Sequence, residues 1–358
     1  MSGPPPPDST ALAPDALSTA LAAGMPIVHE FSILGRRYVA RTDLPAAVPP
    51  LLHRLAGFLA AGAPAAGAAA APAAGAPAAG ARRTYLLCSR DAYRAALAST
   101  GPGPDPGPGP GAGDAFLVNG GRALGFLDLG LAIYYGEGTL LLDVMADARE
   151  AVFLHAAAVG YGASGALLAG EGGSGKSGLA LEFLARGWRV LSDDFCPLAV
   201  GSLEALPFPR GVCVKGRPGR APRLSAHMRE ALPGVAAALA GPPDITGPGV
   251  RLWFCPVLAG RPLAPLRPLA AFILNRRPGR VRLVRLDAAE LGRRLGRLML
   301  GPRPAPRGVT RRLARQVAGY ELNYYGAAAA ADAIAGALDA TVEDAARHAA
   351  GGGTAGAL

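Results

Sequence analysis

The residues of this chain best suited to chemistry lie between Gly170 and Ser177, in the order Gly-Glu-Gly-Gly-Ser-Gly-Lys-Ser. This order fits the pattern G-x-x-x-x-G-K-[ST], in which the backbone N–H groups of a glycine-rich loop bind phosphates. In such a loop Lys176 reaches the β- and γ-phosphates, and the Ser177 hydroxyl binds Mg²⁺. The motif therefore predicts ATP and Mg²⁺ as cofactors. Its nucleotide-binding residues are Gly170, Glu171, Gly172, Gly173, Ser174, Gly175, Lys176 and Ser177.

Two adjacent acids, Asp193 and Asp194, follow the motif and end the apolar run that starts at Trp188. Carboxylates placed beside a phosphate site offer two functions, because one can hold a metal ion while the other accepts a proton. The plain alternative is an acidic turn with solvated side chains. They end the strand that directly follows the helix of the phosphate loop, and this position favours a metal-binding or catalytic function.

His155 lies 15 residues before Gly170, in the run Phe-Leu-His-Ala-Ala-Ala-Val. A lone histidine in an apolar run is more often a satisfied structural residue than a catalytic one. By itself, its position therefore indicates only that it sits at or near the end of a strand.

The elements needed to position these residues can be read from the pattern around them. Residues 166–169 form a short apolar run typical of a buried strand, and Leu179, Ala180, Phe183 and Leu184 recur at helical spacing. Gly187 is a natural stop for that helix, and residues 188–192 form the next apolar strand. The sequence thus predicts strand, loop, helix and strand in the order that a phosphate site requires, with the helix N-terminus facing the anion.

Residues 154–198 resemble the catalytic core of the HPr serine kinase/phosphorylase family, which has a histidine, a phosphate loop and an Asp-Asp strand end at similar spacings. Residues 207–215 and 321–338 are similar to further segments of HPr-kinase-related proteins. The family usually has Ser where this chain has Gly172 and an acid where it has Gly178. The C-terminal phosphorylase signature and the usual N-terminal domain are not recognised, so the chain resembles an HPr-kinase-related protein and not a typical HPr kinase.

This resemblance implies an ATP-dependent kinase that transfers the γ-phosphoryl group to a hydroxyl, such as a serine of a protein or peptide. It implies Asp193 as catalytic base, His155 and Lys176 beside the transferred phosphate, and Ser177 and Asp194 as metal ligands. The implied fold is α/β, a P-loop kinase domain of the HPr kinase and phosphoenolpyruvate carboxykinase type, with a small α+β N-terminal region.

The rest of the chain is expected to divide into four parts. Residues 1–26 are expected to be disordered, 27–113 to form the N-terminal region, 114–345 the kinase domain, and 346–358 a flexible tail. Stretches 61–81 and 101–113 are rich in Ala, Pro and Gly and predict linkers. The expected early elements are hairpins at 27–41, turning at Gly35, and 116–128, turning at 119–121, helices at 46–59 and 90–97, and strands at 84–88 and 139–144.

Composition limits the other classes of function. The first 28 residues lack Lys and Arg, residues 123–145 are interrupted by Asp128 and Glu137, and the four cysteines form no CxxC pair. These features favour a cytoplasmic protein without a membrane partner or a zinc site. A protein, peptide or small-molecule hydroxyl is the expected acceptor, and a homo-oligomer is compatible with the sequence.

The sequence leaves three alternatives to a kinase open. A P-loop ATPase or GTPase would lack an acceptor, but the chain has neither an LSGGQ-like segment nor an N-K-x-D motif. A nucleotide-sensing module would keep the loop without needing Asp193. Nucleic-acid binding could use the 13 arginines from Arg276 to Arg315, which give much of the net charge of +10, but no aromatic residues interleave with them for base stacking. We therefore expect a solvated basic face and no nucleic-acid partner.

Overall fold

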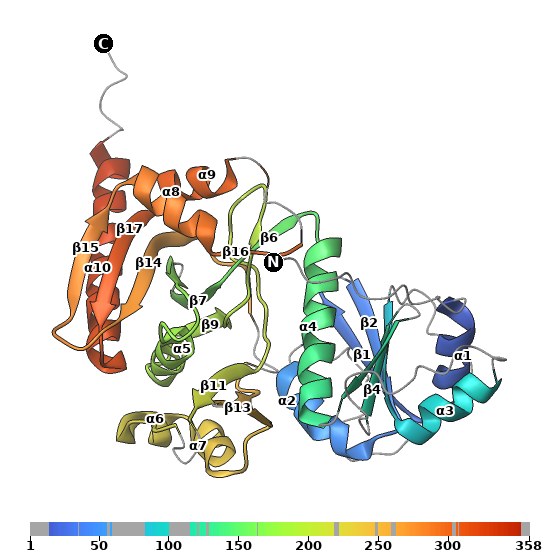
Figure 1. Cartoon of the computed structure of the whole chain (residues 1–358). Helices are drawn as coiled ribbons and strands as arrows, with labels where there is room; N and C mark the ends of the chain where they lie inside the picture. The colour runs from blue at the N-terminus through green and yellow to red at the C-terminus, as the bar shows by residue number, and fades with distance from the viewer. Residues whose placement is uncertain are drawn as a thin grey trace, which may run out of the picture. The chain divides into compact units, whose positions relative to one another are not determined.

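The computed structural model describes the chain over most of its length (Figure 1). The described residues are 14–34, 36–55, 58, 83–99, 115–119, 122–126, 129–162, 164–217, 222–247, 250–258, 263–302, 306 and 308–351. They fall into two compact units: one takes its residues from 1–53, 58–141 and 244–247, the other from 54–57, 142–243 and 248–358. The expected linkers at 61–81 and 101–113, and the expected turns at Gly35 and 120–121, lie outside the described residues.

The first unit is an α+β arrangement around a five-stranded sheet of order β1-β2-β3-β4-β5. One face carries an apolar cluster in which Leu21 and Tyr93 from two helices pack with Leu86 and Val118 of the sheet. In a second apolar cluster, Ala132 and Ile133 pack with Leu87 and Ala115. Its elements are α1 (Pro14–Gly24), β1 (Ile27–Ile33), β2 (Arg36–Thr42), η1 (Pro45–Ala47), α2 (Val48–Leu55), β3 (Arg83–Ser89), α3 (Arg90–Ser99), β4 (Ala115–Asn119), β5 (Arg122–Phe126) and α4 (Leu129–Asp147), the last running on into the second unit.

The structure corrects four expectations about the chain's organisation. Residues 14–24 form helix α1 and bury Leu21, so the expected disorder over 1–26 is wrong for this part. The hairpin of β4 and β5 pairs with β3, so the boundary expected at 114 lies later, near Leu142. Residues 139–144 belong to helix α4, because a short apolar run fits a buried helix as well as a strand. The expected tail at 346–358 is helical as far as Gly351.

Helix α4 is, among the described residues, the single helix long and apolar enough to cross a membrane by length and composition. A core helix of a soluble protein meets the same criteria. The helix carries a buried acid, Glu137, and buries Ala132, Ile133, Leu140 and Val144. The expectation that the chain has no membrane partner therefore stays a prediction.

The second unit is built on a six-stranded sheet of order β15-β17-β14-β8-β7-β9. Its three middle strands, β8, β14 and β17, are parallel, while β7 is antiparallel to both β8 and β9. The strands are β7 (Ala156–Tyr161), β8 (Ser164–Ala169), β9 (Arg189–Ser192), β14 (Pro268–Arg276), β15 (Arg282–Leu286) and β17 (Ala318–Tyr324). The chain is therefore of the α/β class, as expected.

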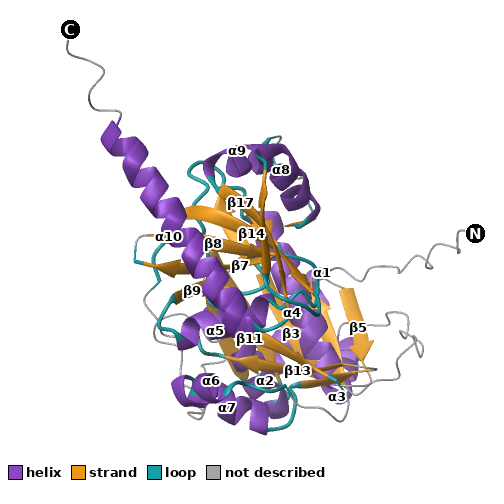
Figure 2. Cartoon of the chain, turned by 90° about the vertical axis from the view of Figure 1, so that its left-hand side faces the viewer, coloured by secondary structure: helices purple, strands orange, loops and turns teal. Residues whose placement is uncertain are grey.

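Both faces of this sheet are covered by helices, which explains why its inner strands are continuously apolar. Leu168 and Phe272 pack on one face with α5 (Lys176–Ala185) and α10 (Ala327–Gly351), which lie side by side (Figure 2). The neighbouring residues Leu167 and Ala271 pack on the other face with α8 (Ala288–Arg297) and α9 (Val309–Gln316). Asp287 caps α8 by accepting a hydrogen bond from the Glu290 N–H (2.8 Å).

Smaller sheets complete the second unit. β6 (Ala151–Leu154) pairs with β10 (Cys196–Ala199) and β16 (Met299–Leu300), and β11 (Val212–Gly216) pairs with β13 (Val250–Cys255). Its remaining helices are α6 (Ala226–Ala231) and α7 (Pro233–Ala240), whereas the short strand β12 (Ile245–Gly247) belongs to the first unit. His155 follows β6 and Cys213 lies in β11, and each of these residues contacts one of the two acids.

A pair of glycines allows close packing at the start of β8. Gly160 and Gly165 lie opposite each other on β7 and β8, and the buried side chain of Leu266 covers both. A Cβ at Gly165 would lie 2.3 Å from Leu266 Cδ2 and 3.3 Å from the Arg267 carbonyl oxygen. This position has no room for a side chain.

We expect Gly165→Ala to destabilise the protein by about 1–3 kcal/mol, because the added methyl overpacks the core. The control is Gly336→Ala in α10, where a Cβ would meet no atom within 4 Å. That change is expected to stabilise by up to about 1 kcal/mol, since alanine favours helix. Melting temperatures of the two variants should move in opposite directions. Equal effects would contradict the packing described for Leu266.

Candidate functional site

The predicted phosphate loop lies between the end of β8 and the start of α5, as the sequence predicts. Gly173 and Gly175 adopt φ angles of +85° and +93°, in the left-handed region that favours glycine. Gly175 is the N-cap of α5 and has no side chain with which to cap the helix. The first N–H groups of α5 are therefore well placed to receive an anion.

A tyrosine from a distant strand supports this loop. The Tyr324 hydroxyl, at the end of β17, donates a hydrogen bond to the Ser174 carbonyl oxygen (2.7 Å). A Cβ at Gly175 would lie 2.2 Å from the same hydroxyl oxygen. Glycine is thus required at position 175 both by its φ angle and by the approach of Tyr324.

Lys176 turns inward at the first position of α5 and is 3% exposed. Its Nζ donates hydrogen bonds to the carbonyl oxygens of Gly170 (2.8 Å) and Glu171 (3.2 Å) and lies 3.5 Å from Asp194 Oδ1. Burial lowers the pKa of Lys176, and the charges of Asp194 and Asp193 act in the opposite direction. The ammonium group therefore lies between the loop and the acidic pair.

Asp193 is fully buried at the end of β9. Its Oδ1 accepts a hydrogen bond from the Ser177 hydroxyl (3.1 Å), and its Oδ2 accepts one from the Cys213 backbone N–H (3.3 Å). Burial, followed by the negative charge of Asp194, raises the pKa of Asp193 to about 7, while the bond from Ser177 opposes this shift. Asp193 is thus attached to the loop through its last residue, Ser177.

Asp194 contacts the other side of the loop. Its φ of +66° lies in the left-handed region, which Asp and Asn tolerate better than most residues. Oδ1 lies 3.2 Å from His155 Nε2 and 3.5 Å from Lys176 Nζ, and the side chain is 19% exposed. Burial alone would raise the pKa of Asp194, but the hydrogen bond from His155 and the charge of Lys176 hold it well below its usual range.

His155 is held in place by its backbone, at the junction of β6 and β7. Its N–H donates to the Leu298 carbonyl oxygen (2.7 Å), and its own carbonyl oxygen accepts from the Gly170 N–H (3.4 Å). The start of the phosphate loop and the histidine are therefore joined directly. This contact explains how a residue 15 positions before Gly170 reaches the acidic pair.

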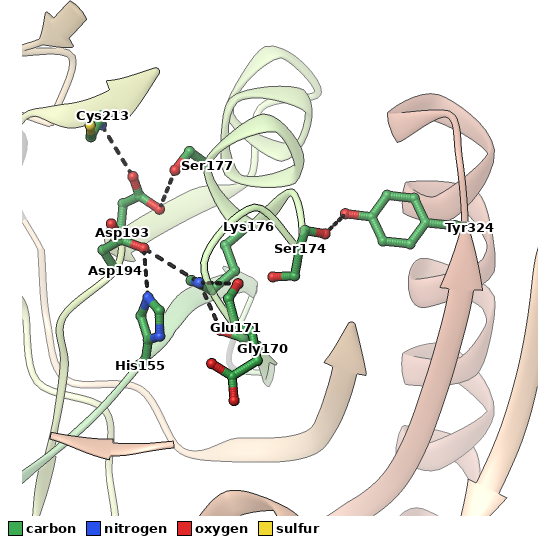
Figure 3. A network of polar contacts seen from close by, with 10 residues as sticks. All are labelled: His155, Gly170, Glu171, Ser174, Lys176, Ser177, Asp193, Asp194, Cys213 and Tyr324. Atoms are coloured by element: carbon green, nitrogen blue, oxygen red, sulfur yellow. Dashed lines mark hydrogen bonds and ion pairs between the residues drawn. The ribbon is translucent and has the colours of Figure 1, made fainter. Parts of the chain in front are cut away.

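The structure thus brings together every side chain for which the sequence predicts chemistry (Figure 3). His155 and Lys176 contact Asp194, and Ser177 contacts Asp193, so the two adjacent acids bring these two groups of contacts together. Glu171 and Gly172 are exposed members of the loop. The convergence makes a solvated acidic turn the wrong description of Asp193, which is buried.

Three contributors were not predicted from the sequence. Tyr324 contacts the backbone of the loop, and Cys213 contacts Asp193. No local pattern in the sequence indicates either contact. The buried cation of Arg210 lies over the rings of Phe195 (5.3 Å) and Phe254 (5.4 Å), and its charge lowers the pKa of both acids. Arg210 belongs to residues 207–215, which are similar to a segment of HPr-kinase-related proteins, but that similarity implies no role for Arg210.

The donors at this site suit a magnesium ion. Ser177, Asp193 and Asp194 offer hydroxyl and carboxylate oxygens, the ligand atoms that Mg²⁺ prefers. Within the described ranges, no group of three or more His, Cys, Asp or Glu side chains could form a closed metal cage. Mg²⁺ is usually bound by one or two carboxylates together with waters and substrate phosphates, so Ser177 and the two acids could serve as its protein ligands.

We expect Gly175→Ala and Tyr324→Phe to be strongly coupled. Gly175→Ala alone should cost about 1–2 kcal/mol for the left-handed backbone, with a further cost for overlap with the Tyr324 hydroxyl. Tyr324→Phe alone should cost about 0.5–1.5 kcal/mol, since one hydrogen bond is lost. The double variant should be less destabilised than the sum, because the hydroxyl that opposes the new methyl is gone.

Melting temperatures of the four proteins in this cycle provide the measurement. Gly172→Ala serves as the matched control in the same loop, since a Cβ there would meet no atom within 4 Å. Strictly additive costs would show that the Tyr324 hydroxyl does not restrict position 175.

Comparison of the chain with protein-family models and with curated proteins returned no match. The contacts of Lys176 and Ser177 with the two acids are therefore the main evidence for a function.

Proposed function

We propose that the chain is an ATP-dependent kinase that transfers the γ-phosphoryl group to a hydroxyl of a protein, peptide or small molecule. The observation that carries the proposal is that two consecutive acids contact the two consecutive polar residues of the loop. Ser177 Oγ lies 3.1 Å from Asp193 Oδ1, and Lys176 Nζ lies 3.5 Å from Asp194 Oδ1. A loop that merely closes a turn has no need of this arrangement.

The proposed fold is a P-loop kinase domain of the HPr kinase and phosphoenolpyruvate carboxykinase type, contained in the second unit. It is supported by the order β8, loop, α5 and β9, with the acids directly after β9. The free N–H groups at the start of α5 would bind the phosphates. Lys176 would exchange its bonds to the Gly170 and Glu171 carbonyls for bonds to phosphate oxygens.

The resemblance implies Asp193 as the catalytic base and Asp194 as a metal ligand. The contacts of the two acids favour the opposite assignment. Asp193 is enclosed and accepts a hydrogen bond from Ser177, the expected metal ligand, so we assign the metal to Ser177 and Asp193. Mg²⁺ bound there with ATP would neutralise charge on the transferring phosphoryl group. Asp194 is partly exposed and faces Lys176 and His155, so we assign it to the acceptor hydroxyl.

The low pKa of Asp194 makes it a weak proton acceptor. Its main contribution would be to orient the hydroxyl for in-line attack, since phosphoryl transfer depends chiefly on positioning and electrostatic stabilisation. His155 would hold the carboxylate through its Nε2 contact, and Lys176 would stabilise the γ-phosphate. Asp194, His155 and Lys176 together would therefore form the face of the site that reacts.

Lys176→Ala is expected to abolish the rise in melting temperature that Mg·ATP gives the wild type. The loop would lose the cation that reaches the phosphates, whereas a ligand at 100 times its Kd adds about 2.7 kcal/mol of stability. Arg347→Ala, which removes an exposed cation near the C-terminal end of α10, is the control. Full Mg·ATP stabilisation of Lys176→Ala would overturn the nucleotide site.

Asp193→Asn and Asp194→Asn should have different effects on turnover. Asp193→Asn should raise the Mg²⁺ concentration needed for half-maximal activity, because a metal-binding carboxylate is lost. Asp194→Asn should leave that concentration nearly unchanged and lower phosphoryl transfer by about 10²-fold, because the acceptor hydroxyl is no longer held in position. Activity titrated with Mg²⁺ at saturating ATP distinguishes the two. The reverse pattern would restore Asp193 as the base and Asp194 as the metal ligand.

The kinase and ATPase readings differ in their dependence on an acceptor. The purified chain should transfer label from γ-labelled ATP to a component of a cell lysate, which mass spectrometry of the labelled product would identify, and Lys176→Ala should not. Phosphate release at the same rate with and without lysate, with no labelled product, would replace the kinase by an ATPase. Binding of ATP without either reaction would leave a nucleotide-sensing module.

A further inference from the structure

The edge of the sheet that carries the phosphate loop also carries the ends of two further parallel strands. β8, β14 and β17 run in the same direction, so their carboxyl ends meet at this edge. β8 continues into the loop, β14 ends at Arg276, and β17 ends at Tyr324, which pairs in register with Arg276. Residues at the ends of β14 and β17 therefore lie beside the loop.

Two consecutive tyrosines at the end of β17 have opposite environments. Tyr324 is buried and donates its hydroxyl hydrogen bond to Ser174 of the loop. Tyr325 is 60% exposed, so the core does not account for its large aromatic ring. Because Tyr324 is fixed against the loop, the neighbouring ring of Tyr325 is held close to the same site.

An arginine joins the exposed ring to the loop. The Arg276 guanidinium carbon lies 5.7 Å from the centre of the Tyr325 ring. In the other direction, Arg276 Cδ is 3.7 Å from the position that a Cβ on Gly175 would occupy. The Arg276 side chain thus runs from the last glycine of the loop to the face of Tyr325.

Tyr324, which precedes Tyr325 and pairs in register with Arg276, lies on the side of the loop away from the acids. Figure 3 shows the loop between Tyr324 on one side and His155, Asp193 and Asp194 on the other. If the γ-phosphate points towards Asp194, the nucleoside must extend in the opposite direction, towards the ends of β14 and β17. An exposed aromatic ring and a planar cation are the groups that stack on a nucleobase.

We propose that Tyr325 and Arg276 form the binding site for the nucleobase, with the base stacked on the Tyr325 ring and Arg276 between the base and the phosphates. The inference rests on the proposed nucleotide function and adds to it the residues that hold the base. It predicts that the chain separates recognition of the base, at β14 and β17, from recognition of the phosphates, at the loop.

The test compares ATP with inorganic tripolyphosphate, which carries the phosphates and no base. Tyr325→Ala should weaken ATP binding roughly tenfold, since a stacked base contributes about that much in affinity. Its affinity for tripolyphosphate should stay that of the wild type. Tyr325→Phe keeps the ring and should bind ATP almost normally.

Tyr161→Ala is the matched control. Tyr161 is 63% exposed and pairs with Ser164 at the start of β8, the end of that strand away from the loop. Calorimetric titration of each variant in the presence of Mg²⁺ gives both affinities, and Tyr161→Ala should change neither.

The possible failures are distinguishable. Unchanged ATP affinity in Tyr325→Ala, or equal loss of ATP and tripolyphosphate affinity, would overturn the base site and leave the phosphate loop intact. A wild type that binds neither ligand would overturn the proposed nucleotide function and the base site together.

Discussion

A buried ammonium group is costly unless its charge is compensated, and Lys176 is buried to 3% exposure. Compensation comes from the two carbonyl oxygens of its own loop and from the Asp194 carboxylate. Each of these partners imposes a demand on the fold. The loop must curl back over the lysine, which requires left-handed glycines, and β9 must end where its acid can face the loop. The ion pair between Lys176 and Asp194 therefore links the local shape of the loop to the order of strands in the sheet.

The sheet meets these demands because both of its faces are covered. α5 can begin directly at the loop only if its apolar side, with Leu179 and Phe183, packs on the sheet face that Leu168 and Phe272 provide. The helices on the other face hold the same strands from behind. With the strand ends fixed in this way, residues far apart in the sequence approach the loop from three directions: His155 from β6, the acids from β9, and Tyr324 from β17.

Much of the site could be predicted from the sequence, because the motif from Gly170 to Ser177 constrains its own neighbourhood. A phosphate loop requires a strand before it and a helix after it, and the acids follow the helix at the next strand end. Which acid contacts which loop residue could not be predicted, since it depends on the φ angle of Asp194 and on a backbone N–H from β11. The division of the chain failed for a related reason. The hairpin at 115–126 looks like the start of the next domain until its pairing with β3 is known, and that pairing is a tertiary contact.

The left-handed backbone at Asp194 limits which amino acids can occupy this position, a restriction that Asp193 does not share. A residue at 194 must adopt a φ of +66° without strain and must also carry a negative charge on a short side chain opposite Lys176. Glutamate would supply the charge but not the backbone preference, glycine would supply the backbone freedom but no charge, and asparagine would satisfy the backbone alone. Aspartate meets both conditions, whereas position 193 has no positive φ and is limited by its burial and by the hydrogen bonds that it accepts from Ser177 and Cys213. We therefore expect residue 194 to be substituted more slowly in evolution than positions where only the backbone conformation or only the charge is constrained.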